Sequence, residues 1–466
     1  IILRPLENVV DQAKAIGERR FISIPEPKTL EFRQVVKSLN NLSERIRQML
    51  AQEAKRLEKL QREAHVAKAS GLMNREPFMR SLDAALHSDD VNSAGSICLV
   101  RLTGLMGLNE KYGHTFVDSM IADMGAGLNS IVTDHSRSAA CRLNGSDFAL
   151  LVPRAIQADQ AAKKIQQALR AVLEDRSIDD DVPLPAAASL YQQGDTIGEI
   201  MTRLDSSMLI SANEGISRIN VAAKGDISLT SVREQMVHWH DIFDHAFSEG
   251  LFSLATFPAI GTDGGLLHIE APVRLAWEGE LITAGQFLPW VNRLEMSRML
   301  DQQVVQLALR KIEETGQPVS VNLSVAAVVE PSFAEWISEQ LSVHADASEK
   351  LWMELAEPMA FRHLSGFKLL CSRVKEYGAK IGIEHMGHQL AALGELHDVG
   401  LDYLKVDANF VRDINENTAN QNLLGNLCTV GHSIGVIVIA EGVRSDEEWE
   451  TLKEIGFDGA TGPGIV

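Results

Sequence analysis

Apolar positions in the first 66 residues recur at helical spacing. A short amphipathic segment around Pro5 places Leu6, Val9, Val10, Ala13 and Ile16 on one face. The segment ends before residues 23–27, where Pro25 and Pro27 lie too close together to sit inside a helix.

A second, longer helix is predicted over residues 30–64. Its apolar stripe slips by one position midway, from Leu39, Leu42, Ile46 and Met49 to Leu50, Leu57, Leu60 and Ala64. Flanked by Glu, Arg, Lys and Gln, this seam is typical of a coiled coil with a discontinuity. One interpretation is an amphipathic helix packed on its own domain. The other, favoured by the absence of Gly and Pro from residue 28 to 70, is a signalling rod that dimerises in parallel.

Short apolar runs alternate with amphipathic segments in the rest of the chain. Residues 96–100 and 148–152 are predicted strands, and residues 156–173 a helix. After a linker near Lys224, further strands are predicted at residues 319–323, 351–354, 379–383, 403–406 and 436–440. Repeated strand–helix units of this kind predict a (β/α)₈ barrel, so the fold class is a multidomain α/β protein.

Composition narrows the functional classes. The chain has 466 residues, 45% hydrophobic and 23% charged, which excludes a largely disordered protein. Its formal charge of −19 argues against non-specific nucleic-acid binding, because phosphate contacts need clustered cations. The four cysteines form no Cys-x-x-Cys pair, and no apolar run is long enough to span a membrane. Since the chain starts at Ile1 rather than Met, we expect it to be part of a longer protein.

Three ordered motifs in the first half resemble the GGDEF diguanylate cyclase domain, with its cyclase-palm-like α/β fold. They are Gly71-Leu72-x-Asn74-Arg75, Asn109-Glu-Lys-Tyr-Gly113-His114 and Arg142-Leu-Asn-Gly145-Ser-Asp147-Phe148. The resemblance places this domain at residues 67–223.

Several positions depart from the cyclase pattern. Arg101 and Thr103 occupy the positions of metal-binding acids, and the signature Gly-Gly-Asp-Glu-Phe reads Asn144-Gly145-Ser146-Asp147-Phe148. The family's inhibitory Arg and Asp fall on His135 and Ser138, and a late Lys falls on Ala212. A nucleoside triphosphate needs a divalent cation held by carboxylates. We therefore expect a regulatory domain without turnover, in which only Asp118 and Asp147 remain as candidate metal ligands.

Five ordered motifs in the second half resemble the EAL domain of cyclic-di-GMP phosphodiesterases, at residues 226–466. They are Glu270-Ala-Pro272-x-Arg274, Asn322-Leu-Ser324, Glu354-Leu-Ala-Glu357, Lys405-Val-Asp407 and Glu441-Gly-Val443. Each lies in or directly after a predicted strand, where barrel side chains point into the site.

The resemblance implies a role for each of these positions. Glu270, Asn322 and Glu354 align with metal ligands, Arg274 with a phosphate contact, and Lys405 and Glu441 with groups that orient water. The expected cyclic-di-GMP site comprises Phe257, Glu270, Pro272, Arg274, Asn322, Glu354, Glu384, Lys405, Asp407 and Glu441.

Some of these positions also depart from the family pattern. Phe257 and Thr461 replace glutamines, and Pro272 replaces the Leu of the name motif. Glu384-His385 replaces the Asp-Asp pair that bridges two cations, so we expect no required metal, and Mg²⁺ at most in a doubtful role.

The N-terminal segment resembles a HAMP domain at Pro5-Leu6, Glu31-Phe32 and Leu39-Asn40. We assign residues 1–50 to a partial HAMP-like segment and 39–66 to a signalling helix. The whole arrangement resembles the LapD-type transmembrane receptors of cyclic-di-GMP. That resemblance implies the cytoplasmic portion of a bacterial inner-membrane protein. It also implies a homodimer through the helix and the EAL domain, and control of a periplasmic protease and biofilm adhesion through an output domain upstream.

Alternatives remain at this stage. The chain could be a weak metal-dependent phosphodiesterase using Glu270, Asn322, Glu354 and Glu384, or a scaffold that binds neither nucleotide nor metal. Glu354 could be a buried, paired strand residue. Arg274 is expected on the same barrel strand and side as Glu270 by the period-two rule, and the competing account is a structural Arg paired with a barrel carboxylate.

Overall fold

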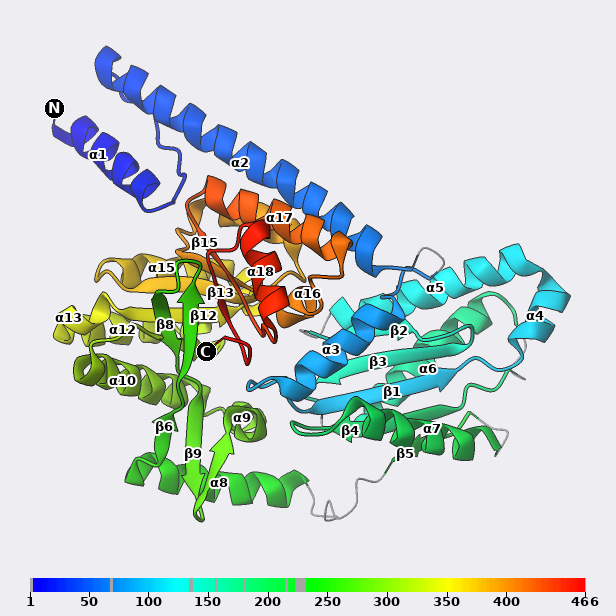
Figure 1. The fold of residues 1–466 in the computed structure, drawn as a ribbon. Coiled ribbons are helices and arrows are strands. Elements are labelled where there is room, and N and C mark those ends of the chain that lie inside the picture. The colour runs from blue at the N-terminus through cyan, green and yellow to red at the C-terminus, as the bar shows by residue number, and fades with distance from the viewer. Residues whose placement is uncertain are drawn as a thin grey trace. The chain divides into compact units, whose positions relative to one another are not determined.

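A computed structural model describes residues 3–67, 70–133, 137–155, 157–178, 182–213, 217–222 and 232–465 (Figure 1). The chain divides into two compact units. The first comprises Ile1–Ala64, Ser253–Val273 and Met296–Val466, and the second comprises His65–Phe252 and Arg274–Glu295.

Two helices open the first unit. α1 (Leu3–Gly17) and α2 (Leu30–His65) are joined by an extended connector. The side-chain amide of Gln12 on α1 donates to Asn40 Oδ1 on α2 at 2.8 Å, so the helices lie side by side (Figure 1).

The prediction of one long helix is confirmed, and α2 docks on the barrel. Its buried stripe is Val36, Ser43, Leu50, Ala54 and Leu57. The predicted seam is therefore only partly right, because Leu42 remains 44% exposed.

The rest of the first unit is the expected closed barrel of eight strands, in the order β11-β12-β13-β14-β15-β16-β7-β8. The strands are β7 (Phe257–Gly261), β8 (Leu266–Glu270), β11 (Val319–Leu323), β12 (Leu351–Ala356), β13 (Lys380–Met386), β14 (Tyr403–Val406), β15 (Ile437–Ala440) and β16 (Gly459–Thr461). One strand departs from the (β/α)₈ pattern: β7 is antiparallel to both neighbours. A short turn links β7 to β8, and a turn without a crossover helix can join only antiparallel strands.

Helices cover the outside of the barrel (Figure 1). They are α10 (Ser297–Thr315), α11 (Ala326–Val329), α12 (Pro331–Val343), α13 (Ala345–Ser348), α14 (Glu357–Arg362), α15 (Leu364–Lys375), the 3₁₀ helix η1 (Leu390–Asp398), α16 (Ala408–Val411), α17 (Thr418–Ser433) and α18 (Asp446–Ile455). Most strand residues are buried, as expected for strands covered on both faces.

The second unit contains a five-stranded sheet in the order β2-β3-β1-β4-β5. Its strands are β1 (Gly95–Arg101), β2 (Ala139–Arg142), β3 (Asp147–Pro153), β4 (Ala186–Tyr191) and β5 (Ile219–Val221). The helices of this domain are α3 (Arg75–His87), α4 (Leu105–Tyr112), α5 (His114–Thr133), α6 (Ala158–Asp175) and α7 (Ile197–Asn213).

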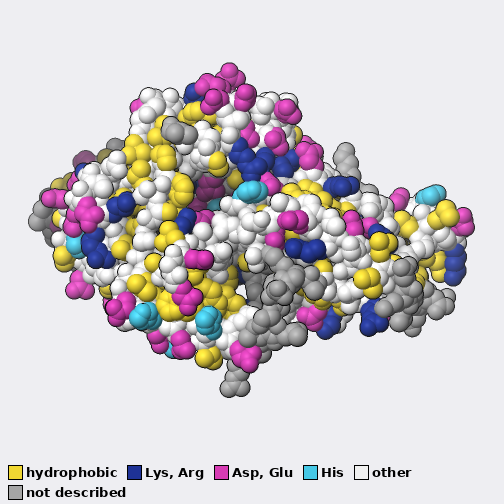
Figure 2. Space-filling model, turned by 60° about the horizontal axis from the view of Figure 1, so that its bottom comes forward, with side chains coloured by type: hydrophobic (Ala, Val, Ile, Leu, Met, Phe, Trp, Pro, Cys, Tyr) yellow, Lys and Arg dark blue, Asp and Glu magenta, His cyan; other side chains and the backbone are white. Residues whose placement is uncertain are grey.

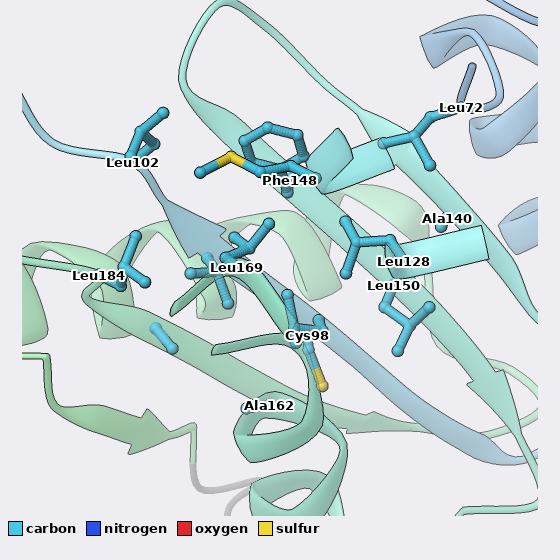
Figure 3. Packing of buried hydrophobic residues seen from close by; sticks show 14 of the residues in the cluster. Leu72, Cys98, Leu102, Leu128, Ala140, Phe148, Leu150, Ala162, Leu169 and Leu184 are labelled. Atoms are coloured by element: carbon cyan, nitrogen blue, oxygen red, sulfur yellow. The ribbon is translucent and has the colours of Figure 1, made fainter. Parts of the chain in front are cut away.

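Two hydrophobic clusters pack on this sheet. Cys98, Phe148 and Leu150 contact the α5 and α6 side chains in one cluster (Figure 3). Ile97, Ala149 and Leu151 belong to the other, with α3 and α7. Alternate residues of β1 and β3 thus enter opposite clusters, as the period of two requires.

Two helices and a three-stranded sheet form a small lobe. α8 (Val232–Glu249) and α9 (Ala284–Arg293) stack Trp239 on Trp290 at 6.2 Å between ring centroids. β6 (Phe252–Leu254), β9 (Val273–Trp277) and β10 (Glu280–Thr283) form a three-stranded sheet.

Surface and thiol chemistry add two facts. All four cysteines are buried and free, and no helix among the described residues is long and apolar enough to cross a bilayer. On the face shown in Figure 2, Lys and Arg side chains lie among Asp and Glu side chains and form no continuous basic stripe.

Candidate functional site

Acidic side chains gather where the barrel strands end. Glu270 is the last residue of β8, Glu354 lies near the end of β12, and Glu384 near the end of β13. Phe257 belongs to the same end, because it opens the antiparallel β7 and pairs with Glu270. The structure thus brings together residues separated by more than a hundred positions in the sequence.

Lys405 on β14 is the centre of this cluster. Its Nζ lies 2.6 Å from Glu270 Oε1, 2.9 Å from Glu354 Oε1 and 3.8 Å from Glu441 Oε1. Lys405 and Glu354 are only 3% and 1% exposed, so the charges are compensated within the barrel. The alternative interpretation of Glu354 as a buried, paired strand residue is therefore correct as far as its pairing goes.

Burial controls the protonation of Glu354. Desolvation raises the pKa of Glu354 to about 8, against the opposing attraction of Lys405. The second carboxylate oxygen, Oε2, is buried and has no hydrogen-bond partner. Glu354 is therefore suited to carry a proton near neutral pH, while surrounding carboxylates hold the pKa of Lys405 well above its ordinary value despite its burial.

His385 occupies the position of the second carboxylate of β13. Its Nδ1 lies 2.7 Å from Glu441 Oε2, and its Nε2 lies 3.4 Å from Glu384 Oε2. The same oxygen, Glu384 Oε2, accepts a hydrogen bond from the Asn322 side-chain amide at 2.6 Å. Burial alone would raise the pKa of Glu441, but His385 holds it below its ordinary value.

Asp407 lies directly after β14 and is fully buried. Its Oδ1 accepts from the backbone N–H of Asn409 at 2.8 Å and so caps α16, while Oδ2 lies 3.3 Å from His388 Nε2. One oxygen of the Asp407 carboxylate therefore caps a helix, a structural role that the sequence did not indicate.

Glu357 fixes the loop that follows β13. Its fully buried carboxylate accepts hydrogen bonds from the backbone N–H groups of Gly387, His388 and Gln389, at 3.2, 3.0 and 2.9 Å. Gly387 has φ 139°, and a Cβ there would meet the Phe410 ring at 2.6 Å. The sequence signal for Glu357 was its place in the motif Glu354-Leu-Ala-Glu357, three positions after Glu354.

Asp301 on α10 supports the loop after β11. Its carboxylate accepts from the backbone N–H and the hydroxyl of Ser324, the latter at 2.7 Å. Burial raises the pKa of Asp301 to about 7. Sequence reasoning missed this residue, although its spacing from Val304, Val305 and Ala308 places an acid on an apolar helix face.

Arg274 does not lie on the barrel strand that the sequence predicted for it. β8 ends at Glu270, and Arg274 lies on β9, in the three-stranded sheet. The strand ends because Pro272 has no N–H for the ladder. The prediction that Arg274 and Glu270 share a strand and a side is therefore wrong.

Arg274 instead forms an ion pair with Asp89, which follows α3 in the second unit. Arg274 is 8% exposed. Burial raises the pKa of Asp89, with Arg274 and the backbone N–H of Gly285 opposing that shift. The competing expectation was a structural Arg paired with a barrel carboxylate. The pairing with a carboxylate is confirmed, but its expected place on the barrel is wrong, because Asp89 belongs to the second unit.

The barrel residues do not suit a pair of divalent cations. Lys405 already pairs with Glu270 and Glu354, and an imidazole stands where a bridging carboxylate would be needed. Glu384, His385 and Glu441 place donor atoms within 4.8 Å of one another, so one cation could bind only by displacing their present hydrogen bonds.

In the second unit, Arg101 neutralises the one acid left in the cyclase signature. Its Nε and Nη2 donate to the two oxygens of Asp147 at 2.7 and 2.9 Å, a bidentate pair. Asn144 also donates to Asp147, and its Oδ1 accepts from the backbone N–H of Ser146. Burial raises the pKa of Asp147, but Arg101 brings it below its ordinary value.

The structure also describes other residues of this domain that the comparison with the cyclase pattern singled out. The Thr103 hydroxyl donates to the carbonyl of Pro183, Ser138 and Ala212 are half-buried, and Asp118 is exposed on α5. His135 lies outside the described residues. An open cavity of about 560 Å³ lies beside the signature loop, lined by Leu105, Met106, Asn109, Glu110, His114, Gly145 and Ser146.

Comparison with known families decides what these two units are. The model of the diguanylate cyclase GGDEF domain matches residues 64–218, and that of the EAL domain matches residues 240–465. The chain is a GGDEF–EAL protein. The resemblances inferred from the motifs are confirmed for both domains.

Three relatives extend the comparison. RNase E specificity factor CsrD of Escherichia coli (strain K12) is 24% identical over 400 residues, covering 84% of this chain and 61% of CsrD. Cyclic di-GMP phosphodiesterase PdeB of Shewanella oneidensis is 23% identical over 431 residues, covering 87% of this chain and 48% of PdeB. The chain thus spans about half to three fifths of these relatives.

The third relative is a solved structure. The S helix–GGDEF–EAL portion of Vibrio cholerae LapD in its apo form has a TM-score of 0.77 at 20% identity, covering 90% of this chain and 99% of that one. Its form bound to c-di-GMP has a TM-score of 0.50 at 20% identity, covering 88% and 98%. The likeness shows that this GGDEF–EAL protein shares the LapD fold.

Proposed function

We propose that this GGDEF–EAL protein is a cyclic-di-GMP receptor whose EAL domain binds the nucleotide without hydrolysing it. The observation that carries the proposal is the His385–Glu441 hydrogen bond at the end of β13, where a carboxylate pair would hold cations. Two-metal hydrolysis needs carboxylates around a shared water, whereas binding needs only complementarity to the ground state.

The polar groups that remain suit a nucleotide. Glu441 can accept a hydrogen bond from a guanine N–H donor, and the 48% exposed Phe257 ring offers an apolar surface to a base. Asp407 could accept such a bond only if its buried carboxylate became accessible. Support also comes from Vibrio cholerae LapD, a protein of the same fold with a solved c-di-GMP-bound form.

The GGDEF domain is proposed as a regulatory domain without cyclase activity. A guanidinium bound to Asp147 supplies a fixed positive charge but cannot hold the cation that a nucleoside triphosphate needs. Accordingly, GTP with Mg²⁺ should yield no cyclic-di-GMP above a buffer control.

The wider assembly remains part of the proposal. We place the chain in the cytoplasmic portion of a bacterial inner-membrane receptor that dimerises through α2 and the EAL domain. Exposed apolar side chains at Leu6, Val10, Val35 and Leu42 offer a surface for the N-terminal part of such a dimer. Control of a periplasmic protease, and through it of biofilm adhesion, rests on the resemblance to LapD-type receptors.

One experiment tests receptor against enzyme. Equilibrium binding of cyclic-di-GMP is measured, and the same samples are then analysed for linear product with Mg²⁺ and with Mn²⁺. We expect saturable binding and intact nucleotide. A matched variant, His385→Asp, restores the missing carboxylate and should bind divalent cations more tightly. Linear product from the wild type, growing with time and metal, would show that the protein is a phosphodiesterase.

The alternative function is a weak or conditional phosphodiesterase. It is favoured by the closeness of Glu384, His385 and Glu441, which could share one cation, and by the relative PdeB, which is named as a phosphodiesterase. Product formation that disappears in Glu384→Gln would support this alternative over the receptor.

A further inference from the structure

The turn that follows α1 contacts the end of the barrel opposite the Lys405 cluster. Arg19 Nη1 lies 2.5 Å from Asp402 Oδ1 and donates to the Leu401 carbonyl at 3.3 Å. The backbone N–H of Phe21 donates to the His397 carbonyl at 2.8 Å. Asp402 directly precedes β14, whereas Lys405 and Asp407 lie at the other end of that strand. These contacts are therefore separate from the candidate nucleotide site.

The receiving surface, here the base socket, consists of Lys375, His397, Gly400, Asp402 and Gly435. Its acid is held rigidly by the barrel: Asp402 Oδ2 accepts from the backbone N–H of Ile381 at 3.0 Å, and its carbonyl accepts from that of Ile437 at 3.0 Å. Lys375 Nζ lies 3.3 Å from Asp402 and also donates to the Glu18 carbonyl. The carboxylate thus has a fixed position before Arg19 reaches it.

Glycine makes the close approach of the turn possible. Gly400 has φ 80°, and a Cβ there would lie 2.8 Å from Arg20 Cγ and 2.9 Å from the Glu18 carbonyl oxygen. At Gly435, φ is 75° and a Cβ would lie 3.2 Å from Arg19 Nε. A side chain at Gly400 would push the turn away, so this part of the base socket is shaped to its occupant.

The docked turn is also fixed to both helices. Gln12 on α1 donates to the Ile22 carbonyl at 2.9 Å, and Ser43 on α2 donates to the same carbonyl at 3.0 Å. Asn40 on α2 exchanges two hydrogen bonds with the backbone of Ile24, at 2.8 and 3.0 Å. Because the connector is bonded to α1 and α2 at once, a shift of one helix against the other must strain it.

A second contact ties α2 to the opposite end of the barrel. Gln61 donates to the Gly387 carbonyl at 2.7 Å. Between Asn40 and Gln61, the α2 backbone at Ala51 packs closely on Gly394 of η1. From Asn40 to Gln61 a helix rises about 30 Å, at 1.5 Å per residue. The helix is therefore fastened at both ends of the barrel, by two chemically unrelated contacts.

We propose that the base socket is a docking site for the connector segment Glu18–Phe21 and that it anchors the N-terminal helices to the EAL barrel independently of the nucleotide site. The occupant is chosen by charge and shape: a cation at residue 19 meets a preset carboxylate, beside a glycine that admits the backbone. A displacement of α1 against α2 is then transmitted to this end of the barrel, and the strength of the Arg19–Asp402 ion pair sets how large a displacement releases the connector.

Hydrogen exchange on the full chain without nucleotide tests this anchor. Arg19→Glu places like charges face to face, and we expect amide exchange in the peptide around Phe21 to accelerate about tenfold or more. Peptides covering β14 and β15 should be unchanged. The matched control is Arg47→Glu, because Arg47 lies on the exposed surface of α2 and pairs with Glu44 of that helix.

The outcomes are separable from those of the proposed function. Since the readout needs no ligand, a failure to bind cyclic-di-GMP leaves the anchor standing. Should Arg19→Glu not yield folded protein, Arg19→Gln and Gly400→Leu attack the pair and the backbone approach separately, each with faster exchange expected at Phe21. Exchange equal to wild type in the folded Arg19 variants would overturn the proposal.

Discussion

Removing the Arg274 guanidinium tests whether this residue is structural, a ligand contact, or both. In Arg274→Ala, the Asp89 carboxylate loses its counter-ion while its Oδ1 remains buried. Breaking a fully buried pair costs about 3–5 kcal/mol. The Asp89 side chain is 24% exposed and keeps the Gly285 N–H, so we expect less, about 2–3 kcal/mol.

Thermal unfolding without ligand measures this cost. For a unit of this size, 2–3 kcal/mol corresponds to a decrease in Tm of about 5–10 °C. The pairing is isolated by a double-mutant cycle with Asp89→Asn, because removing Arg274 should cost less once residue 89 carries no charge. Equal destabilisation by Arg274→Ala in both backgrounds would refute the ion pair as its cause.

The same variants also test whether Arg274 contacts the nucleotide. If Arg274 also contacts a phosphate of cyclic-di-GMP, Arg274→Ala should lower affinity about ten- to a hundredfold. Asp89→Asn, which leaves the guanidinium without its carboxylate partner, should then bind at least as tightly as wild type. Unchanged affinity in Arg274→Ala would mean that Arg274 does not contact the nucleotide.

Further predictions concern burial, charge and metal. Lys405→Met should lower urea stability at pH 7.5 by about 3–5 kcal/mol, and adding Glu270→Gln should recover part of it, since the carboxylate that Lys405 compensates is then removed as well. Burial raises the pKa of Asp301 in the folded protein to about 7. The stability of the wild type should therefore decrease as the pH rises from about 4 to about 7, by up to ~1.4 kcal/mol per pH unit. Asp301→Asn should flatten the profile of Tm against pH. Leu57→Glu should lower the Tm, whereas Leu42→Glu, at an exposed position, should not. Dialysis against a chelator should leave the Tm unchanged, and a fall would reveal a bound cation.

Local pattern predicted much of the architecture. α2 was predictable because it lacks Gly and Pro over its length, and the barrel strands because parallel strands buried on both faces form continuous apolar runs. The buried face of α2 was harder to predict. Val36 and Ser43 are buried while Leu42 is exposed. The Ser43 hydroxyl donates to the Ile22 carbonyl of the connector, so tertiary packing, rather than the helix's own periodicity, selects the buried face.

The limits of sequence reasoning are clearest at Arg274. Period two places Arg274 beside Glu270 only if one strand contains both, and Pro272 between them ends the strand. The partner, Asp89, lies in another domain of the sequence, and no local pattern relates the two residues. Long-range charge pairs of this kind are decided by folding as a whole.

Both candidate sites share one physical feature: other side chains compensate their buried carboxylates. A buried carboxylate needs a compensating charge or proton. Arg101 supplies that charge to Asp147, Lys405 supplies it to Glu270, and Glu354 with its raised pKa can hold a proton. Because side chains compensate these acids, we expect the sites to keep their shape when divalent cations are removed. An acid can thus persist at a motif position for the sake of its ion pair, so an acidic motif alone is weaker evidence for catalysis than the identity of the cation facing it.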